Sequence, residues 1–261
     1  MRIKETATTV SQEKLCKDVY SLWISTNAAG YASAGQFVSL YPNSDSMLLP
    51  RPISICEINE RKGFLRLVYR VAGKGTLEFT RLAPGDTIEI LGPNGNGFLP
   101  FCDKAKEKNT KALLVGGGIG IPPMVELAKT LSCDVTVVAG DRSAEEMFLT
   151  KELKREGRLV IATDDGSSCI RGTVIDAIKE EKIQADVIYA CGPKPMLKGI
   201  KAFAEEEGIP AFVSMEERMA CGVGACLGCV CESTAKDDHS KVNNKRVCVD
   251  GPVFPVSEVV L

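Results

Sequence analysis

The chain has 261 residues, with 32 lysines and arginines against 34 aspartates and glutamates and 44% hydrophobic residues. This near-neutral balance gives no sign of a partner such as nucleic acid or a charged membrane surface. The N-terminal stretch is polar and lacks the apolar core of a signal peptide, and no apolar run approaches the about 18–20 residues of a membrane-spanning helix. We therefore expect a cytoplasmic protein of two domains and an appendage, with no nucleic-acid and no membrane partner.

Eleven cysteines and one histidine restrict the chemistry open to the chain. Without an export signal, the cysteines point away from a disulfide framework, because the cytosol keeps thiols reduced. Five of them lie within residues 221–261 and the other six are scattered. The single histidine, His239, excludes Ser–His and Cys–His nucleophiles, multi-histidine metal sites and Rieske-type ligation.

Residues 1–102 are predicted to form a small antiparallel β-barrel or sandwich, because short β-branched or aromatic segments alternate there with turn signals. One turn is explicit in Ala83-Pro84-Gly85-Asp86, where proline presets the first central position and glycine supplies a positive φ at the second. A charged, turn-like stretch at 103–110 sets the first domain boundary. The expected strands are 19–24, 36–41, 53–58, 64–71 and 87–91.

Residues 103–215 change to alternating strands and helices, which predicts a doubly wound parallel sheet covered by helices. The strands should be buried, because 112–115, 135–139, 159–163, 187–190 and 211–215 are unbroken apolar runs. Helix ends are marked by a Ser143–Glu146 capping box with Gly157 as the stop. Pro193 in a first turn and Gly208 mark a second helix.

Residues 216–261 form a third segment, which is too small to fold well without a staple. The spacing C-x4-C-x2-C with a distant fourth cysteine is typical of plant-type [2Fe–2S] ferredoxins. It predicts the ligands Cys221, Cys226, Cys229 and Cys248. A zinc site is the alternative, but structural zinc sites usually use two pairs of closely spaced cysteines and this segment offers one.

The glycines of the cysteine segment support the cluster interpretation. Gly222, Gly224 and Gly228 allow the backbone to wrap a cluster and to aim N–H groups at the sulfurs. Cys231 is a possible substitute for Cys229. Since Val230 between them suggests a strand whose alternate residues face opposite ways, we interpret Cys231 as a packing residue.

A glycine-rich turn follows the first strand of the α/β half and precedes a helix with proline in its first turn. Gly116, Gly117, Gly118 and Gly120 thus place backbone N–H groups and a helix dipole where a pyrophosphate can bind, although such glycines can also simply tighten a turn. Asp164, after the third strand, can accept hydrogen bonds from a ribose and repel a 2′-phosphate, which favours NAD over NADP.

Two alternatives remain open at the third strand. Asp164 can equally cap a simple Asp-Gly turn, and Arg142, after the second strand, argues for a 2′-phosphate instead. In the β-rich half, Arg51, Arg70 and a short helix at 77–82 with Thr76 as its N-cap make a reasonable clamp for a dinucleotide pyrophosphate.

The motif R-x-x-S in a barrel, followed by GGGIGIPP and Cys191-Gly192-Pro193, resembles the ferredoxin–NADP reductase superfamily. The resemblance implies an FAD-binding barrel and a nicotinamide-binding α/β domain, with Cys191-Gly192 near the nicotinamide. It implies the cofactor-binding residues Arg51, Pro52, Ile53, Ser54, Val68, Tyr69, Arg70, Gly75, Thr76, Gly116, Gly117, Gly118, Gly120, Cys191 and Gly192, beside Asp164 predicted above from the third strand.

Essentially the whole chain, including LLPRPISI, LGPNGNGF, MEERMACGVGAC and CVDGPVF, looks like the electron-transfer subunits of B-type, NAD-dependent dihydroorotate dehydrogenase. That resemblance implies domains at 1–102 (FAD), 103–215 (NAD) and 216–261 ([2Fe–2S]). It also implies a catalytic subunit that carries FMN and oxidises dihydroorotate in pyrimidine biosynthesis, in a heterotetramer of two of each. Electrons would pass from FMN through the cluster and FAD to NAD+, with no residue for substrate chemistry on this chain.

Two other functions compete with this one. Relatives include NADH-dependent ferredoxin:NADP oxidoreductases and sulfide dehydrogenases, in which the first cluster ligand is typically Asp rather than the Cys221 found here. The chain could therefore be a flavin reductase subunit linked to ferredoxin, sulfide or hydrogenase. A zinc-stapled, nucleotide-binding regulatory protein is the third possibility. The cysteine Cys231 and the long loop at 233–246 depart from the pattern.

Overall fold

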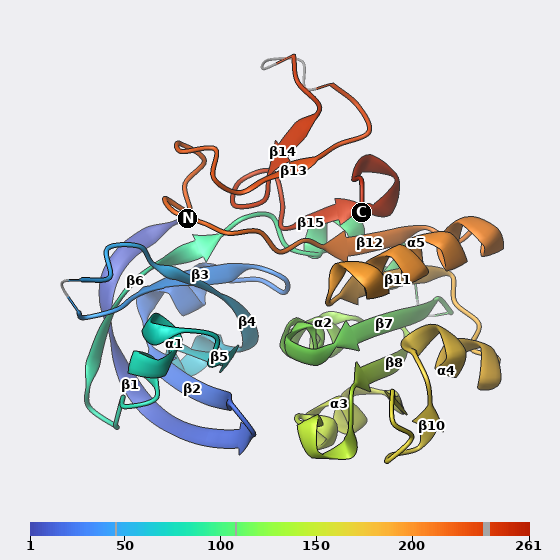
Figure 1. Cartoon of the computed structure of the whole chain (residues 1–261), viewed down its shortest axis with the longest axis horizontal. Coiled ribbons are helices and arrows are strands. Elements are labelled where there is room, and N and C mark those ends of the chain that lie inside the picture. The colour runs from blue at the N-terminus through green and yellow to red at the C-terminus, as the bar shows by residue number, and fades with distance from the viewer. Residues whose placement is uncertain (45, 108, 237–240) are drawn as a thin grey trace.

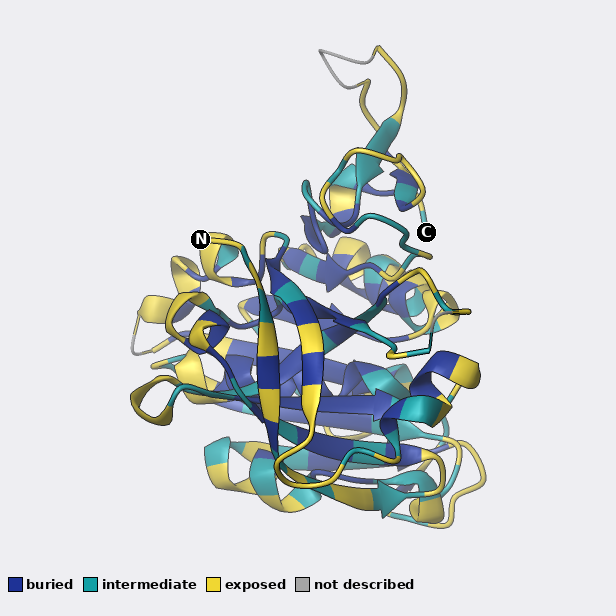
Figure 2. Cartoon of the chain, turned by 90° about the vertical axis from the view of Figure 1, so that its left-hand side faces the viewer, coloured by how far each residue is buried: buried dark blue, intermediate teal, exposed yellow. Residues whose placement is uncertain are grey.

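The computed structural model describes residues 1–44, 46–107, 109–236 and 241–261; His239 lies outside them, as does part of the loop at 233–246. A β-barrel and a helix-covered sheet lie side by side, and the C-terminal segment lies across one end of both (Figure 1). Figure 2 shows this segment projecting from the body, with buried strands in the body beneath it. No helix in the described ranges is long and apolar enough to cross a membrane.

The first half is a closed six-stranded barrel with the strand order β1-β2-β5-β4-β3-β6, every pair antiparallel. This confirms the predicted barrel. The turn at 83–86 also forms as predicted, with Gly85 at φ +95°. The elements are β1 (Ile3–Cys16), β2 (Val19–Ser25), β3 (Phe37–Tyr41), β4 (Arg51–Asn59), β5 (Phe64–Arg70), α1 (Lys74–Phe79) and β6 (Thr87–Asn94).

Strand β1 was not among the expected strands, although it closes the barrel by pairing with both β2 and β6. Its inward positions include the small Ala7 and the polar Thr9, both buried, so it carries little of the apolar alternation that marks a strand. Glu5 anchors it, because its carboxylate accepts hydrogen bonds from the Thr26 hydroxyl, the Asn27 amide at 2.7 Å and the Ala28 N–H at 3.2 Å.

The second half is a seven-stranded sheet in the order β10-β9-β8-β7-β11-β12-β15, parallel except for β15. Helices α2 and α3 cover the face toward the barrel, and α4 and α5 cover the other, so the doubly wound prediction is confirmed. The elements are β7 (Lys111–Gly117), α2 (Pro122–Thr130), β8 (Asp134–Asp141), α3 (Thr150–Glu156), β9 (Arg158–Thr163), β10 (Ile170–Arg171), α4 (Val174–Glu180), β11 (Val187–Cys191), α5 (Lys194–Glu207) and β12 (Ala211–Ser214).

Several predicted helix ends were wrong. Ser143 makes no capping hydrogen bond, because Arg142 binds the Glu146 carboxylate at 2.9 Å and only a 3-10 turn (Ala144–Glu146) follows. Helix α3 begins later, after Leu149, although Gly157 does follow its end. Pro193 stands one residue before α5, whose first turn holds Pro195 instead.

The C-terminal segment contributes the two-stranded sheet β13 (Val230–Glu232) and β14 (Asn244–Arg246), and the strand β15 (Val253–Pro255). Strand β15 joins the large sheet antiparallel to β12. Asn96, just after the barrel strand β6, pairs with Pro252 and donates from its side chain to the carbonyl oxygen of Val249 at 3.0 Å. The segment is therefore fastened to both halves of the chain.

Candidate functional site

The four cysteines predicted as cluster ligands lie in one region, arranged as two pairs. The backbone N–H of Cys226 donates to the Cys221 sulfur at 3.4 Å, and Cys229 lies close enough to Cys248 to raise the pKa of its thiol. No three cysteine, histidine or carboxylate side chains in the described residues converge on a single metal ion. A [2Fe–2S] cluster needs no such trio, because each of its two irons takes two protein ligands.

Backbone N–H groups turn toward these sulfurs, as the glycines predict. Val223 donates to the Cys221 sulfur and Gly228 to the Cys226 sulfur, each at 3.4 Å. Although burial opposes ionisation, these N–H donors lower the pKa of the Cys221 thiol to about 6. The donors that favour a thiolate would equally stabilise the sulfurs of a bound cluster.

The loop can turn this way because Gly222 and Gly224 adopt φ of +66° and +84°; Gly228 does not, and Leu227 takes the left-handed conformation instead, at +58°. Cys248 is fully buried, and burial followed by the neighbouring Cys229 raises its pKa to about 12. The two pairs thus differ in exposure. Cys226 is exposed and Cys221 is half-buried, whereas Cys229 and Cys248 are both buried.

Cys231 lies on β13 opposite Lys245 and is buried in the same core as the sulfur of Cys229. Its burial raises the pKa of its thiol. The expectation that Cys229 and Cys231 face opposite ways is wrong, because residues two apart in a strand share a face and both lie in this core. The packing role of Cys231 stays a prediction, which its burial supports. The loop carrying Cys248 is braced by Arg246, whose guanidinium binds the Asp250 carboxylate through two nitrogens at 3.1 and 3.0 Å.

The residues implied for FAD come from β4, β5 and the start of helix α1. Ile53 and Tyr69 point into the barrel core, whereas Val68 packs outward. Tyr69 donates its hydroxyl to Gln12 at 2.9 Å, so only its backbone is available to a ligand. Ser54, on β4, and Arg70, the last residue of β5, are both half-buried.

Arg51 and Gly75 are brought into contact although they are 24 positions apart in the chain. A Cβ at Gly75 would lie 2.6 Å from the Arg51 guanidinium, so only glycine lets the cation rest against the start of α1. The prediction that Thr76 caps this helix was wrong: helix α1 begins at Lys74, and the Thr76 hydroxyl accepts the N–H groups of Ala72 at 2.9 Å and Gly73 at 3.2 Å. The Thr76 side chain therefore fixes the loop rather than a ligand.

A cavity of about 540 Å³ opens at the carboxyl ends of β7, β8, β9 and β11, where parallel sheets usually bind nucleotides. Of the residues predicted for the nicotinamide cofactor, Gly117, Gly118, Asp164 and Gly192 line it, whereas Gly116, Gly120 and Cys191 do not. The glycine turn and Cys191-Gly192 meet at its floor, because the strand order reverses between β7 and β11. A Cβ at Gly120 would lie only 2.2 Å from the Cys191 carbonyl oxygen.

Asp164 is exposed at this cavity, and the Asp-Gly turn beside it is held by the next residue, because Asp165 accepts the N–H and hydroxyl of Ser167 at 2.9 and 2.6 Å. Asp164 is therefore free of the capping role that the sequence left open. Arg142 is turned toward Glu146 at 2.9 Å.

Three residues line the nucleotide cavity although the sequence did not predict them there: Asp141, Glu216 and the barrel residue Arg70. Burial raises the pKa of Asp141, and its Oδ2 has no hydrogen-bond partner among the described residues. Burial also raises the pKa of Glu216. Asp141 was detectable, because it ends the second strand about 20 residues after the glycine turn. The place of Arg70 in the cavity wall depends on how the barrel docks against the α/β half, so no local sequence pattern indicates it.

Each of the three regions of the chain matches a known protein domain family. Residues 6–98 match an oxidoreductase FAD-binding domain, residues 114–202 an oxidoreductase NAD-binding domain, and residues 216–260 the iron–sulfur cluster binding domain of dihydroorotate dehydrogenase B. The electron transfer subunit of dihydroorotate dehydrogenase B (NAD+) from Listeria welshimeri is 44% identical over 255 residues, covering 97% of each chain. That of a Geobacillus species (strain WCH70) is 43% identical over 266 residues, covering 100% of each. The chain belongs to this family.

The three cofactor-binding domains expected from the sequence are thus confirmed. Among solved structures, an NADH-dependent reduced ferredoxin–NADP oxidoreductase superposes with a TM-score of 0.83 at 30% identity, covering 97% of this chain and 89% of the other. A ferredoxin–NADP+ reductase from Plasmodium falciparum, at 17% identity and a TM-score of 0.65 over 80% of this chain and 96% of the other, shows the fold alone.

Proposed function

We propose that this chain conducts electrons between a partner subunit, which oxidises dihydroorotate on FMN, and NAD+. The observation that carries the proposal is the position of the cysteine segment, fastened to the barrel through Asn96 and to the nucleotide sheet through β15. When bound, the [2Fe–2S] cluster and FAD supply the redox chemistry, because the cluster exchanges single electrons and FAD exchanges a hydride with the nicotinamide.

The chain's own residues hold and separate these groups. The paired thiols Cys221/Cys226 and Cys229/Cys248 would each hold one iron. Arg51 against Gly75 would offer a cation for the FAD pyrophosphate, and Ser54 and Val68 would contribute to holding the flavin. The glycine turn 116–120 would hold the NAD pyrophosphate, with Asp164 accepting ribose hydroxyl groups and repelling a 2′-phosphate.

The partner is proposed to bind at the cysteine segment. Val223 and Leu227, beside the ligands, are 40% and 59% exposed, and Cys226 is exposed between them. An apolar rim around a ligand at the surface fits a subunit that receives electrons over a short distance. The relatives' name, electron transfer subunit, implies a catalytic partner subunit. On the resemblance drawn from the sequence, we propose that this partner carries FMN in a cytoplasmic complex of two copies of each chain. The domain boundaries 102/103 and 215/216 remain part of the proposal.

A second function is favoured by one specific observation, the likeness to the NADH-dependent ferredoxin–NADP oxidoreductase over 97% of the chain. In that case the chain would pass electrons from NADH to ferredoxin or another acceptor. Cys221 argues against this second function, because relatives of that branch typically have an aspartate as the first cluster ligand.

Purification of the chain with its natural partner separates these functions. We expect a complex that contains FMN, FAD and two irons per copy of this chain, and that reduces NAD+ when dihydroorotate is added. A chain that purifies alone and reduces ferredoxin with NADH as rapidly as the complex reduces NAD+ would refute the proposal. A colourless, zinc-containing protein would refute both functions.

A further inference from the structure

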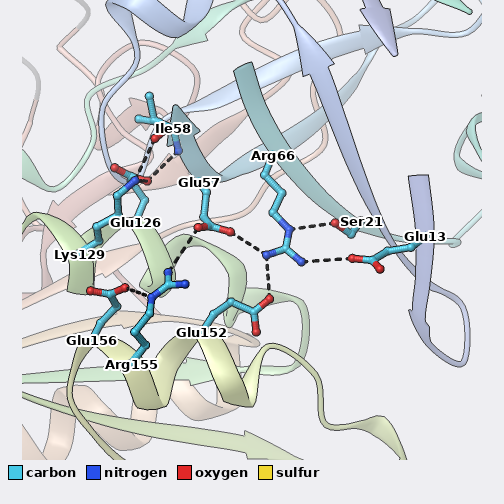
Figure 3. Close-up of polar contacts among 10 residues, drawn as sticks. All are labelled: Glu13, Ser21, Glu57, Ile58, Arg66, Glu126, Lys129, Glu152, Arg155 and Glu156. Carbon is cyan, nitrogen blue, oxygen red and sulfur yellow. Dashed lines mark hydrogen bonds and ion pairs between the residues drawn. The ribbon is translucent and has the colours of Figure 1, made fainter. Parts of the chain in front are cut away.

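Helix α2 and strand β4 meet where the two cofactor domains dock, at the far end of each from its binding motif. Strand β4 begins at the motif Arg51–Ser54 and ends at Asn59. Helix α2 follows the glycine turn directly and contacts the end of β4 through Glu126 and Lys129 (Figure 3).

The contact completes an open strand edge. Strand β3 accompanies β4 only as far as Ser54 in their register, so the backbone of Ile58 has no strand on that side. The Ile58 N–H donates to the Glu126 carboxylate at 2.7 Å, and Lys129 Nζ donates to the Ile58 carbonyl at 2.9 Å. Two side chains one helical turn apart therefore supply the acceptor and the donor that a neighbouring strand would supply.

Glu126 is an unusual residue for a helix surface. It is only 7% exposed, and burial raises the pKa of its carboxyl group, with Lys129 at 3.3 Å partly compensating the charge. A carboxylate so placed is costly unless its hydrogen bonds are made. The helix thus has a strong preference for the one docked position in which Ile58 and Lys129 satisfy Glu126.

A second contact fixes the same two halves nearby (Figure 3). Arg66, on the outer face of β5 and 5% exposed, donates to Ser21 of the barrel at 2.9 Å. It also donates to Glu57 at 2.7 Å and to Glu152 of helix α3 at 2.8 Å. With two points fixed, the halves can neither slide nor rotate freely against each other.

We propose that Glu126 is a positioning residue for hydride transfer: it fastens the nucleotide-binding helix to the flavin-binding strand and thereby sets the distance between the two cofactors. This rests on the proposed function. Helix α2 is rigid, and Glu126 lies about 9 Å along it from the glycine turn at 1.5 Å per residue. A shift at the clamp therefore reaches the nicotinamide site, where a misplacement of about 1 Å costs about 100-fold in rate.

The test compares Glu126→Ala, Glu126→Gln and Lys129→Met in the full chain with its cofactors bound. Glu206→Ala is the matched control, because Glu206 is an exposed carboxylate on α5, which packs on the opposite face of the sheet. Two readouts are needed: deuterium exchange at the Ile58 amide, which requires no activity, and the rate of FAD reduction by NADH in rapid mixing.

We expect Glu126→Ala to lose protection at Ile58 and to slow flavin reduction about 10- to 100-fold, with the half-saturating NADH concentration changed less than about threefold. Glu126→Gln keeps an acceptor for the N–H and should restore protection and most of the rate. Lys129→Met should give an intermediate loss. The control should match wild type, and the visible spectrum of the cluster should be unchanged in all variants.

The proposal is overturned if Glu126→Ala exposes the Ile58 amide but reduces flavin at the wild-type rate, or if it leaves the amide protected. If Glu126→Ala does not fold, Lys129→Met decides, because wild-type exchange and rate in that variant also overturn it. Failure of the proposed NAD-to-FAD chemistry is distinguishable, since wild-type protein would then not be reduced by NADH, while exchange at Ile58 would still report the clamp.

Discussion

Replacing Gly120 by alanine should damage the nucleotide site selectively. The new Cβ would lie 2.2 Å from the Cys191 carbonyl oxygen and 2.4 Å from its carbon, so the turn and the end of β11 must separate by at least about 0.8 Å to reach the 3.0 Å limit of real contacts. Strand β11 cannot yield easily, because β7 and β12 pair with it on both sides. Overpacking of this kind costs ~1–3 kcal/mol.

Gly117→Ala in the same turn is the matched control for the melting temperature only, because Gly117 also lines the nucleotide cavity. Its Cβ would meet the Met196 sulfur at 2.5 Å, and a flexible methionine side chain can move away at little cost. For Gly120→Ala we expect a melting temperature lower by roughly 2–10 °C and an NADH concentration for half-maximal flavin reduction raised about tenfold or more. The cluster spectrum should be retained. Wild-type melting and NADH dependence for Gly120→Ala, or an equally lowered melting temperature for Gly117→Ala, would refute the close contact.

Three further predictions follow from other contacts. Cys226→Ser should lose the iron–sulfur absorption whereas Cys231→Ser keeps it; loss of iron in Cys231→Ser would make Cys231 a ligand. Asn96→Ala removes the side-chain donor to the Cys248 loop. It should slow electron transfer between FAD and the cluster in flash or rapid-mixing experiments, while NADH-dependent flavin reduction continues. An unchanged rate of electron transfer would contradict the role of Asn96 in holding the cysteine segment against the barrel. Hydrogen bonds lower the pKa of Glu5 against the opposing effect of burial, so its carboxylate stabilises the fold above its ordinary pKa and this contribution is lost as the pH falls below about 4.5. Glu5→Gln should therefore be less stable than wild type by about 1 kcal/mol at pH 7, and the difference should shrink toward pH 3.5; a constant difference across that range would count against the ionised carboxylate.

Much of the fold was accessible from the sequence because buried parallel strands are apolar without interruption, as in 112–115 and 187–190. Strand β1 was missed because Ala7 and Thr9 provide its inward face. Strand β15 has three residues and exists only because β12 lies beside it. Such elements are defined by their partners rather than by their own pattern.

In the candidate site, too, some features are indicated by local sequence and others depend on the packing between elements. Cysteine spacing and the position of the glycine turn are local, so the sequence could indicate both. Glu126 and Lys129 look from the sequence like an ordinary surface pair on a helix. Their role depends on the docking of α2 against Ile58, which no local pattern records. The Thr76 prediction failed because one helix start can place a threonine at either its first or its third position.

The most direct test of the central claim is electron paramagnetic resonance of the complex after anaerobic addition of NADH, with Cys226→Ser as the comparison. We expect bleaching of the flavin absorption together with a signal from one reduced [2Fe–2S] cluster per copy of this chain. The cluster signal should be absent in Cys226→Ser. Flavin bleaching without any cluster signal in the wild-type complex would contradict the central claim.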